Sequence, residues 1–393
     1  MIKVDEALKI VFDNVKELPS DTIPIELSLG RILSADISAD FDIPACDISS
    51  MDGYAVNSED KSKIFNVVGE SKAGEKFVRS ISSGEAVNIM TGGIIPDGAD
   101  SVVMVEHTKL ISVAQVEILK ASIKGENIRC QGEEVKQNTV VLRKGKKITP
   151  EILGMLARVG RTEVAVSYQP QVAIVSTGNE IINIDEILSE GTIFDANYYI
   201  LSGMVDMCGG QVVRLGIVRD EVEEIKTVIS RGLSSDVILL SGGVSAGKYD
   251  LVHIALEELS GTILFHKVAQ RPGKPVLFGK INDVLIFGLP GNPVSVAVTF
   301  ENFVKPVLYK MQGAEYSPLI VEAVLEKDFV KDKGLKYFVR AKTEWRDGVF
   351  YSMPYDNQSS GVLRSCVESN SLIILDEEQE FIKAGTKIKI KYV

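Results

Sequence analysis

The chain has 393 residues, of which 45% are hydrophobic and 25% are charged, as in a folded globular protein of two to four domains. Its net charge of −11 argues against a broad nucleic-acid or membrane-binding surface, so cations that hold an anionic ligand must be concentrated locally. The four cysteines are scattered without CxxC spacing, which predicts neither a zinc site nor a disulfide framework. The N-terminus lacks the basic and apolar segments of a signal peptide, and no apolar run approaches the ~20 residues of a membrane span. We therefore expect a cytoplasmic protein.

The first 166 residues are predicted to form a β-rich N-terminal region. Residues 4–15 have the period of an amphipathic helix, whose apolar face consists of Val4, Ala7, Leu8, Val11 and Val15. From about residue 20 to 165 the pattern changes to short β-type runs broken by Gly, Pro, Asp and Asn, which suggests one or more β modules. Within this region, residues 149–160 are expected to form one further helix.

From residue 170 onward, apolar strands alternate with helices. The expected strands are VAIVSTGNE, QVVRLGIVRD, DVILLSGG and VLIFGLPGNP, and the expected helices are DANYYILSGMVDMCGG, EVEEIKTVISRGL, DLVHIALEELSG and VSVAVTFENFVKPVLYKM. Continuous apolar strands alternating with helices indicate a parallel sheet covered on both faces, here a doubly wound α/β domain over 167–314. Residues 315–393 return to β-type runs with an Asp347-Gly348 hairpin signal, and a small barrel or sandwich fits them.

Three loops with glycines and polar groups follow strands of the predicted parallel sheet. They are 176–180 (STGNE), 241–245 (SGGVS, with Ser241, Gly242 and Gly243) and 289–293 (LPGNP, with Pro290 and Pro293). Ligands bind beyond the carboxyl ends of such strands, where glycines let the backbone approach and a helix N-terminus offers N–H groups to an anion. One such loop is common in structural roles, but three together favour a phosphate-containing ligand.

A cluster of cations lies in the segment HKVAQRPGKP, which contains Lys267, Arg271 and Lys274. Charged runs usually form a solvated face. Here two prolines and a glycine make the segment a stiff loop between two predicted strands, and the chain is acidic elsewhere. Because Arg suits bidentate contact with oxyanions and Lys acts as a point charge, an anion site is the interpretation that we favour slightly.

Carboxylates also follow the predicted strands, at Glu180, Asp220 and Asp250. If strand order brings them together, they would suit Mg²⁺, which prefers a few carboxylates with phosphate and water. Spacing alone favours the simpler interpretation that each acid caps a turn or a helix. Asp52, beside Gly53, is likewise a turn signal by itself.

At these residues the chain resembles a known family, the molybdopterin molybdenumtransferases, which also include the C-terminal domain of gephyrin. The matching segments occur in family order and cover nearly the whole chain: SSMDGYAV (49–56), NIMTGGIIPDGADSVVMVE (88–106), NIRCQGEE (127–134), VSTGNE (175–180), SGGVSAGKYD (241–250), KVAQRPGKP (267–275), GLPGNPVS (288–295) and NQSSGVLRS (357–365). Each motif alone is weak, and their order makes the resemblance specific.

The resemblance implies a multidomain α/β plus β protein: an elongated N-terminal module with an inserted β domain at about 45–140, the α/β domain, and a C-terminal β-barrel. It also implies a homodimer in which the N-terminal part of one subunit closes the α/β crevice of the other. The reaction would depend on Mg²⁺ and would convert adenylylated molybdopterin and molybdate into molybdenum cofactor and AMP. The upstream adenylyltransferase and recipient molybdoenzymes would be partners, without nucleic acid or membrane.

By position, the resemblance implies four functional acids, namely Asp52, Glu180, Asp220 and Asp250, with Glu180 and Asp250 as metal ligands. The positions that it implies for ligand contact are Thr91, Arg129, Glu134, Ser241, Gly242, Gly243, Lys267, Arg271, Lys274, Pro290, Pro293 and Ser360. The chain departs from the family pattern at three positions, since Glu134 and Asn179 stand where Asp is usual and Arg271 stands where Lys is common.

Two other functions stay open at this point. The α/β domain alone also resembles molybdopterin adenylyltransferases, which lack the MDGYA and TGGIIPDGAD segments. A non-catalytic scaffold like gephyrin's corresponding domain is the second alternative, although the acids and cations favour catalysis. Nothing in the sequence separates molybdate from tungstate as the oxyanion.

Overall fold

The computed structural model describes residues 1–243 and 251–393 and divides the chain into two compact units. The large unit comprises Met1–Ser34, Lys144–Pro150 and Glu163–Val393, and the small unit comprises Ala35–Arg143 and Glu151–Thr162. Asp250 and the end of the 241–245 loop lie outside the described residues. No helix within the described ranges is long and apolar enough to cross a membrane.

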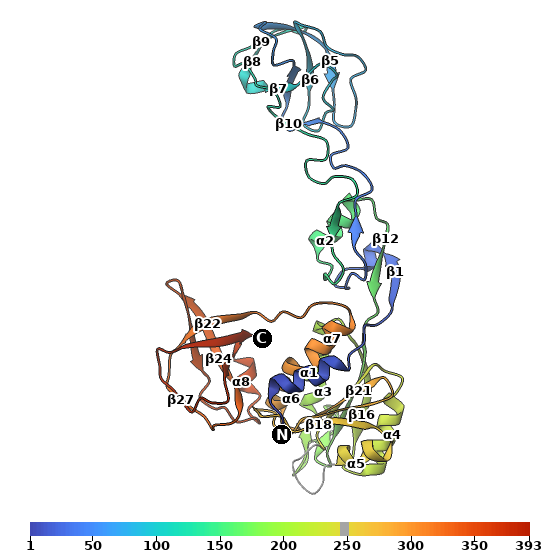
Figure 1. The fold of residues 1–393 in the computed structure, drawn as a ribbon, viewed down its shortest axis with the longest axis vertical. Coiled ribbons are helices and arrows are strands. Elements are labelled where there is room, and N and C mark those ends of the chain that lie inside the picture. The colour runs from blue at the N-terminus through green and yellow to red at the C-terminus, as the bar shows by residue number, and fades with distance from the viewer. Residues whose placement is uncertain (244–250) are drawn as a thin grey trace. The chain divides into compact units, whose positions relative to one another are not determined.

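A six-stranded sheet forms the centre of the large unit, in the order β16-β13-β17-β21-β20-β18 (Figure 1). Its strands are β13 (Gln171–Thr177), β16 (Gln211–Val218), β17 (Val237–Ser241), β18 (Thr262–His266), β20 (Leu277–Ile281) and β21 (Val284–Leu289). The four strands β16, β13, β17 and β21 pair in parallel, as their continuous apolar runs predicted.

The sheet continues beyond the four expected parallel strands with an antiparallel edge. There β20 is antiparallel to β21, and β18 is antiparallel to β20. Only Asn282 and Asp283 separate β20 from β21, and such a short connection joins antiparallel strands, since parallel strands need a crossover of a dozen or more residues. Asn282 takes a φ of 53°, as a tight turn requires.

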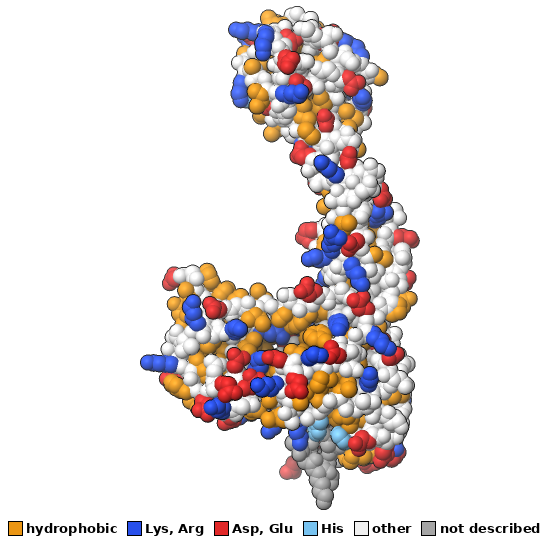
Figure 2. Space-filling model, viewed as in Figure 1, with side chains coloured by type: hydrophobic (Ala, Val, Ile, Leu, Met, Phe, Trp, Pro, Cys, Tyr) orange, Lys and Arg blue, Asp and Glu red, His pale blue; other side chains and the backbone are white. Residues whose placement is uncertain are grey.

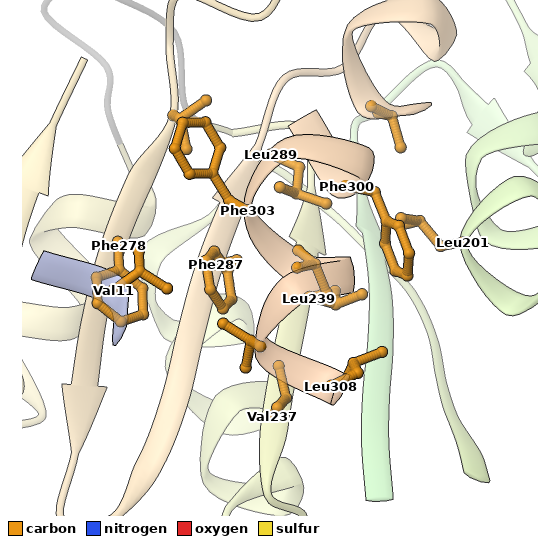
Figure 3. Close-up of a cluster of buried hydrophobic side chains, with 14 of the residues drawn as sticks. Val11, Leu201, Val237, Leu239, Phe278, Phe287, Leu289, Phe300, Phe303 and Leu308 are labelled. Carbon is orange, nitrogen blue, oxygen red and sulfur yellow. The ribbon is translucent and has the colours of Figure 1, made fainter. Parts of the chain in front are cut away.

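Helices cover both faces of this sheet, as a doubly wound α/β domain requires. They are α1 (Val4–Asp13), α3 (Ala196–Met207), α4 (Val222–Gly232), α5 (Leu251–Glu258), α6 (Pro293–Thr299), the π-helical turn η3 (Phe300–Val304) and α7 (Lys305–Met311). Alternate residues of the strands enter two separate apolar clusters, because successive strand side chains point to opposite faces. One cluster, with Leu239, Phe287 and Phe300, is drawn in Figure 3. The other contains the buried side chains of α4 and α5.

Helix α1 is predicted correctly from its period, yet it packs in the core of the α/β sheet. Val4, Ala7, Val11 and Val15 are buried in the same cluster as Phe278 (Figure 3). The following strand β1 (Ser20–Pro24) pairs with β12 (Glu163–Ser167). The beginning of the chain therefore belongs to the large unit, whose core is completed by residues from both ends of the sequence.

A closed β-barrel forms the C-terminal part of the large unit. Its strands are β22 (Ile320–Leu325), β24 (Lys336–Arg346), β25 (Val349–Pro354), β26 (Ser371–Leu375) and β28 (Lys387–Tyr392). They pair in the order β24-β25-β22-β28-β26, and β26 pairs with β24 again to close the ring. The Asp347-Gly348 hairpin is confirmed, since Arg346 pairs with Val349 across it. Two short pieces accompany the barrel, the β23–β27 pair (Phe329–Val330 and Phe381–Ile382) and α8 (Arg364–Val367).

The small unit contains a six-stranded sheet in the order β7-β4-β6-β5-β9-β8. These strands are β4 (Gly53–Val56), β5 (Ile64–Ser71), β6 (Glu85–Ile89), β7 (Ser101–Met104), β8 (Thr108–Ser112) and β9 (Gln115–Ile118). Two short pairs lie outside the sheet, β3 (Ile48–Ser49) with β10 (Ile128–Arg129) and β2 (Ile37–Ser38) with β11 (Val140–Leu142). The expected helix near 149–160 is α2 (Pro150–Arg158), and nearly all of it lies in this unit.

Candidate active site

The three predicted loops begin side by side at the carboxyl edge of the central sheet. Ser176 of β13 pairs with Ser241 of β17, which in turn pairs with Leu289 of β21. Asn197, near the start of α3, connects two of the loops by donating hydrogen bonds to Ser241 Oγ (2.8 Å) and to the carbonyl oxygen of Gly291 (2.7 Å). Asn197 could not be predicted from the sequence, because a lone asparagine in a helix belongs to no motif.

Glycine is required where the second loop leaves β17. Gly242 has a φ of 101°, and a Cβ there would lie 2.4 Å from the carbonyl oxygen of Thr177. Gly243 has a φ of 66°, and its Cβ would lie 2.9 Å from Thr177 Oγ1. Larger residues would therefore push apart two adjacent loops of the crevice.

Two of the predicted acids lie close enough to interact in this crevice. Burial raises the pKa of Asp220, and repulsion from Glu180 raises it further. The backbone N–H of Asp220 also donates to Asn179 Oδ1 at 3.4 Å, which joins the turns after β13 and β16. Ser176 Oγ is buried nearby in β13 without a hydrogen-bond partner among the residues that the structure describes.

This pair of acids fits a divalent cation. Two carboxylates that repel each other are both stabilised in their ionised form when a cation binds between them. Among cations, Mg²⁺ prefers a few carboxylates together with phosphate oxygens and water. Within residues 1–243 and 251–393 no cluster of three or more His, Cys, Asp or Glu side chains suits a metal ion. The predicted ligand Asp250 lies outside those ranges.

A pocket of about 750 Å³ lies between the loops of the central sheet and the C-terminal barrel. Its lining residues are Gln270, Arg271, Pro272, Gly273, Lys274, Pro275, Pro290, Asn292, Ser295, Asp332, Leu335, Gln358, Ser359 and Ser360. Four of the predicted ligand-contacting residues, Arg271, Lys274, Pro290 and Ser360, are thus brought together here from three distant segments. Lys267 and Pro293 are not among the lining residues.

Hydrogen bonds join the barrel side of the pocket to the α/β side. Asn292 Nδ2 donates to Ser360 Oγ at 3.0 Å, and the backbone N–H of Val294 donates to the carbonyl oxygen of Ser360 at 3.2 Å. From behind, the fully buried Arg340 donates to Ser365 Oγ and to the carbonyl oxygen of Ser359, both at 3.1 Å. The NQSS segment that resembles the family motif is therefore held in one conformation at the pocket wall.

The two pocket cations differ in their partners. Arg271 Nη1 donates to Asp332 Oδ2 at 2.7 Å and to Tyr337 Oη at 3.1 Å. Lys274 is exposed and makes no ion pair with any described residue. Lys267 is held through its backbone, which has a φ of 72° and donates to the carbonyl oxygen of Val276. Sequence reasoning missed Asp332 and Tyr337, which lie far from the cation loop in the chain.

The remaining predicted residues belong to the small unit and form two local groups there. In the first group, Asp52 Oδ1 accepts hydrogen bonds from the backbone N–H (2.7 Å) and the hydroxyl (2.9 Å) of Thr91, and these bonds lower the pKa of Asp52. Asp52 is therefore an ionised carboxylate at neutral pH. In the second group, Glu134 forms ion pairs with Arg158 at 2.6 Å and with Arg129 at 3.3 Å.

Comparison with known proteins covers the chain almost from end to end. Residues 2–160 match the model of the "MoeA N-terminal region (domain I and II)", residues 173–310 that of a "Probable molybdopterin binding domain", and residues 322–392 that of the "MoeA C-terminal region (domain IV)". The molybdopterin molybdenumtransferase of Staphylococcus aureus strain COL is 34% identical over 398 residues, which cover 99% of this chain and 95% of the relative. The chain belongs to the MoeA family.

Other MoeA proteins give the same result. The molybdopterin molybdenumtransferase of Bacillus subtilis strain 168 is 33% identical over 402 residues, covering 99% of this chain and 93% of the relative. The crystal structure of the MoeA protein of molybdopterin biosynthesis from Pyrococcus horikoshii OT3 is similar with a TM-score of 0.87 at 30% identity, covering 100% of each chain. The multidomain fold with a central α/β domain and a closed C-terminal barrel is therefore that of the MoeA family.

Proposed function

We propose that this protein is a molybdopterin molybdenumtransferase of molybdenum cofactor biosynthesis, which inserts molybdate into adenylylated molybdopterin and releases AMP. The observation that carries the proposal is the full-length similarity to relatives of that name. Residues of three motif segments, 267–275, 288–295 and 357–365, line the pocket and support it. Both substrates are anions. Their approach costs electrostatic repulsion, which localised cations must offset in an acidic protein.

The residues of the pocket suit the oxyanion. Lys274 has no carboxylate partner in the described chain, so its positive charge is available to molybdate. Arg271 adds a second cation, and Ser360 places a hydroxyl on the opposite wall. Gly242 and Gly243 allow the second loop to pack against Thr177, and the pterin phosphates would bind beside this loop at the neighbouring crevice.

Mg²⁺ would be held by Glu180 and Asp220, together with Asp250. When bound, it supplies a Lewis acid that polarises the phosphoanhydride. The chain's own contribution at this edge is to hold the two acids close enough that the charge of Glu180 opposes ionisation of Asp220. Asp52, ionised in its own unit, is the fourth proposed acid.

We further propose a homodimer, in which the small unit of one subunit supplies Asp52 to the crevice of the other. Large apolar side chains stay exposed in the segment that follows the first crevice loop, namely Ile184, Ile187, Leu188, Ile193 and Phe194. This cluster supports the proposal, because a second subunit would remove it from water. Light scattering of the purified protein tests the dimer directly, and a monomer at micromolar concentration would contradict it.

The wider assignments follow from the same proposal. We propose domain boundaries at 1–166, 167–314 and 315–393, with an inserted β domain at about 45–140. A cytoplasmic location is supported by four free cysteines. On the face drawn in Figure 2, acidic and basic side chains are interspersed, which supports small-molecule substrates over nucleic acid. The upstream adenylyltransferase and the recipient molybdoenzymes are the proposed protein partners.

The test is a reconstitution with the full chain, adenylylated molybdopterin, Mg²⁺ and molybdate, in which AMP release is followed. We expect AMP without added ATP. A requirement for ATP would instead indicate an adenylyltransferase, and binding of pterin without AMP release would indicate a scaffold. Repeating the assay with tungstate shows whether the enzyme distinguishes the two oxyanions.

A pair of variants tests the pocket within the same assay. Lys274→Met is expected to lower the rate at limiting molybdate by roughly tenfold or more, as for a lost charge-assisted contact. Lys383→Met removes another exposed lysine, outside the pocket, and is expected to behave like the wild type. Equal behaviour of the two variants would show that Lys274 does not hold the oxyanion.

A further inference from the structure

One edge of the Arg271 guanidinium is occupied by protein, while the other is not. Nη1 donates to Asp332 Oδ2 at 2.7 Å and to Tyr337 Oη at 3.1 Å. Nε and Nη2 have no hydrogen-bond partner within residues 1–243 and 251–393. Arg271 and Asp332 both line the pocket. A planar guanidinium held by one nitrogen can therefore present its free N–H groups to a ligand oxyanion.

The partners of Nη1 are themselves connected. Tyr337 Oη donates to Asp332 Oδ2 at 2.9 Å, and it accepts from the backbone N–H of Asp332 at 3.1 Å. The guanidinium carbon of Arg271 also lies 5.5 Å from the centre of the Tyr337 ring. Asp332, Tyr337 and Arg271 thus form a closed network in which each member contacts the other two.

A buried lysine fixes the backbone beneath this network. Lys331 is 5% exposed, and its ammonium group donates to the carbonyl oxygens of Asp332 (3.2 Å), Asp376 (2.9 Å) and Gln379 (2.7 Å). Its Nζ lies 5.1 Å from the centre of the Tyr337 ring. The segment that carries Asp332 is therefore rigid, although the Asp332 side chain itself is exposed.

We propose that Asp332 and Tyr337 are positioning residues, which orient the Arg271 guanidinium for bidentate contact with the oxyanion substrate in the pocket. The inference rests on the proposed function, since it concerns the molybdate that this pocket would take. It also gives a reason for arginine at position 271. The planar guanidinium of arginine can bind Asp332 at one edge and a ligand at the other. A lysine has a single ammonium group and offers no such pair of edges.

The effect of removing the Asp332 carboxylate on molybdate binding distinguishes a positioning role from a purely electrostatic one. A carboxylate at the wall of an anion pocket repels the ligand, so its removal would strengthen molybdate binding. If the carboxylate orients Arg271, its removal weakens binding in spite of the lost negative charge. Tyr337→Phe separates the two roles further, because it removes a hydrogen-bonding group without changing any charge.

The experiment measures binding of molybdate to the full chain by calorimetry, together with the KM for molybdate and kcat in the AMP-release assay. We expect Asp332→Asn and Tyr337→Phe each to weaken molybdate binding by about tenfold, with a matching rise in KM and little change in kcat. Asp283→Asn is the control. It removes a comparable exposed ion pair with Lys16 (2.6 Å) outside the pocket, and it is expected to bind molybdate like the wild type.

A second background tests whether the two residues act through Arg271. In Arg271→Lys, adding Asp332→Asn is expected to weaken binding much less than it does in the wild type, as for residues that share one interaction. Tighter or unchanged binding in the single variants would overturn the inference, and so would equal losses in both backgrounds or a wild type that binds no molybdate. If molybdate binding weakens as expected but the wild type releases no AMP, the proposed function fails while the positioning role stands.

Discussion

Gly242→Ala is the substitution for which the structure gives the sharpest expectation. The added Cβ would lie 2.4 Å from the carbonyl oxygen of Thr177, a backbone atom that cannot rotate away, at a φ of 101°. An unfavourable backbone conformation costs about 1–3 kcal/mol and overpacking about 1–3 kcal/mol, so we expect a destabilisation of about 2–6 kcal/mol. Because Thr177 ends the strand before Glu180, the crevice would widen and AMP release would fall.

Gly291→Ala is the matched control, since Gly291 lies in the neighbouring loop, 289–293, at the same sheet edge. A Cβ there would meet nothing nearer than Gly242 Cα at 3.8 Å, which is ordinary contact. Its φ is outside the positive region, so we expect a stability change of about 1 kcal/mol at most. Thermal unfolding of both variants is the assay. A melting temperature of Gly242→Ala equal to that of the wild type, or an equal loss in both variants, would refute the steric argument.

Two further substitutions probe charges in the large unit. Asp220→Asn is expected to stabilise the protein at pH 7 and to lower activity. Burial and Glu180 raise the pKa of Asp220, so the stability that this group contributes is present at low pH and lost as pH rises through its folded-state pKa. Glu301→Gln is expected to destabilise by about 3–5 kcal/mol, because it leaves the buried Lys391, 3.2 Å away, without its carboxylate. Glu322→Gln, in an exposed pair, is its control, with an expected cost of at most about 1 kcal/mol.

Melting temperatures at several pH values check both predictions. The advantage of Asp220→Asn should shrink as pH falls through the raised pKa of Asp220, because the wild-type carboxyl then becomes protonated. An advantage that is independent of pH would mean that ionisation of Asp220 is not its cause. Equal melting temperatures of the Glu301 and Glu322 variants would show that the buried ion pair contributes no more than an exposed one.

Local sequence patterns predicted the four parallel strands of the central sheet because burial and periodicity are properties of short segments. Pairing direction is not such a property. The segments of β20 and β21 are apolar strands in either orientation, and only the two residues Asn282 and Asp283 between them require the antiparallel turn. For the same reason the period of α1 predicted a buried face but not the sheet that buries it.

The candidate site was predictable where one motif carries several of its groups, as in the loop with Arg271 and Lys274. It was not predictable where a partner comes from another domain. Asp332 and Tyr337 lie in barrel segments without any motif, and only the folded chain brings them to Arg271. Lys267 shows the converse, since it shares the cation loop but does not line the pocket.

The packing of α1 against the central sheet has a consequence for synthesis of the protein. Lys16, just after this helix, forms an ion pair with Asp283, 267 residues later in the chain. A ribosome adding roughly 5–20 residues per second would need on the order of half a minute to supply that partner. During this time the apolar side of α1 has no complete sheet to cover it, so we expect it to stay exposed on the nascent chain until the strands up to β21 have been made.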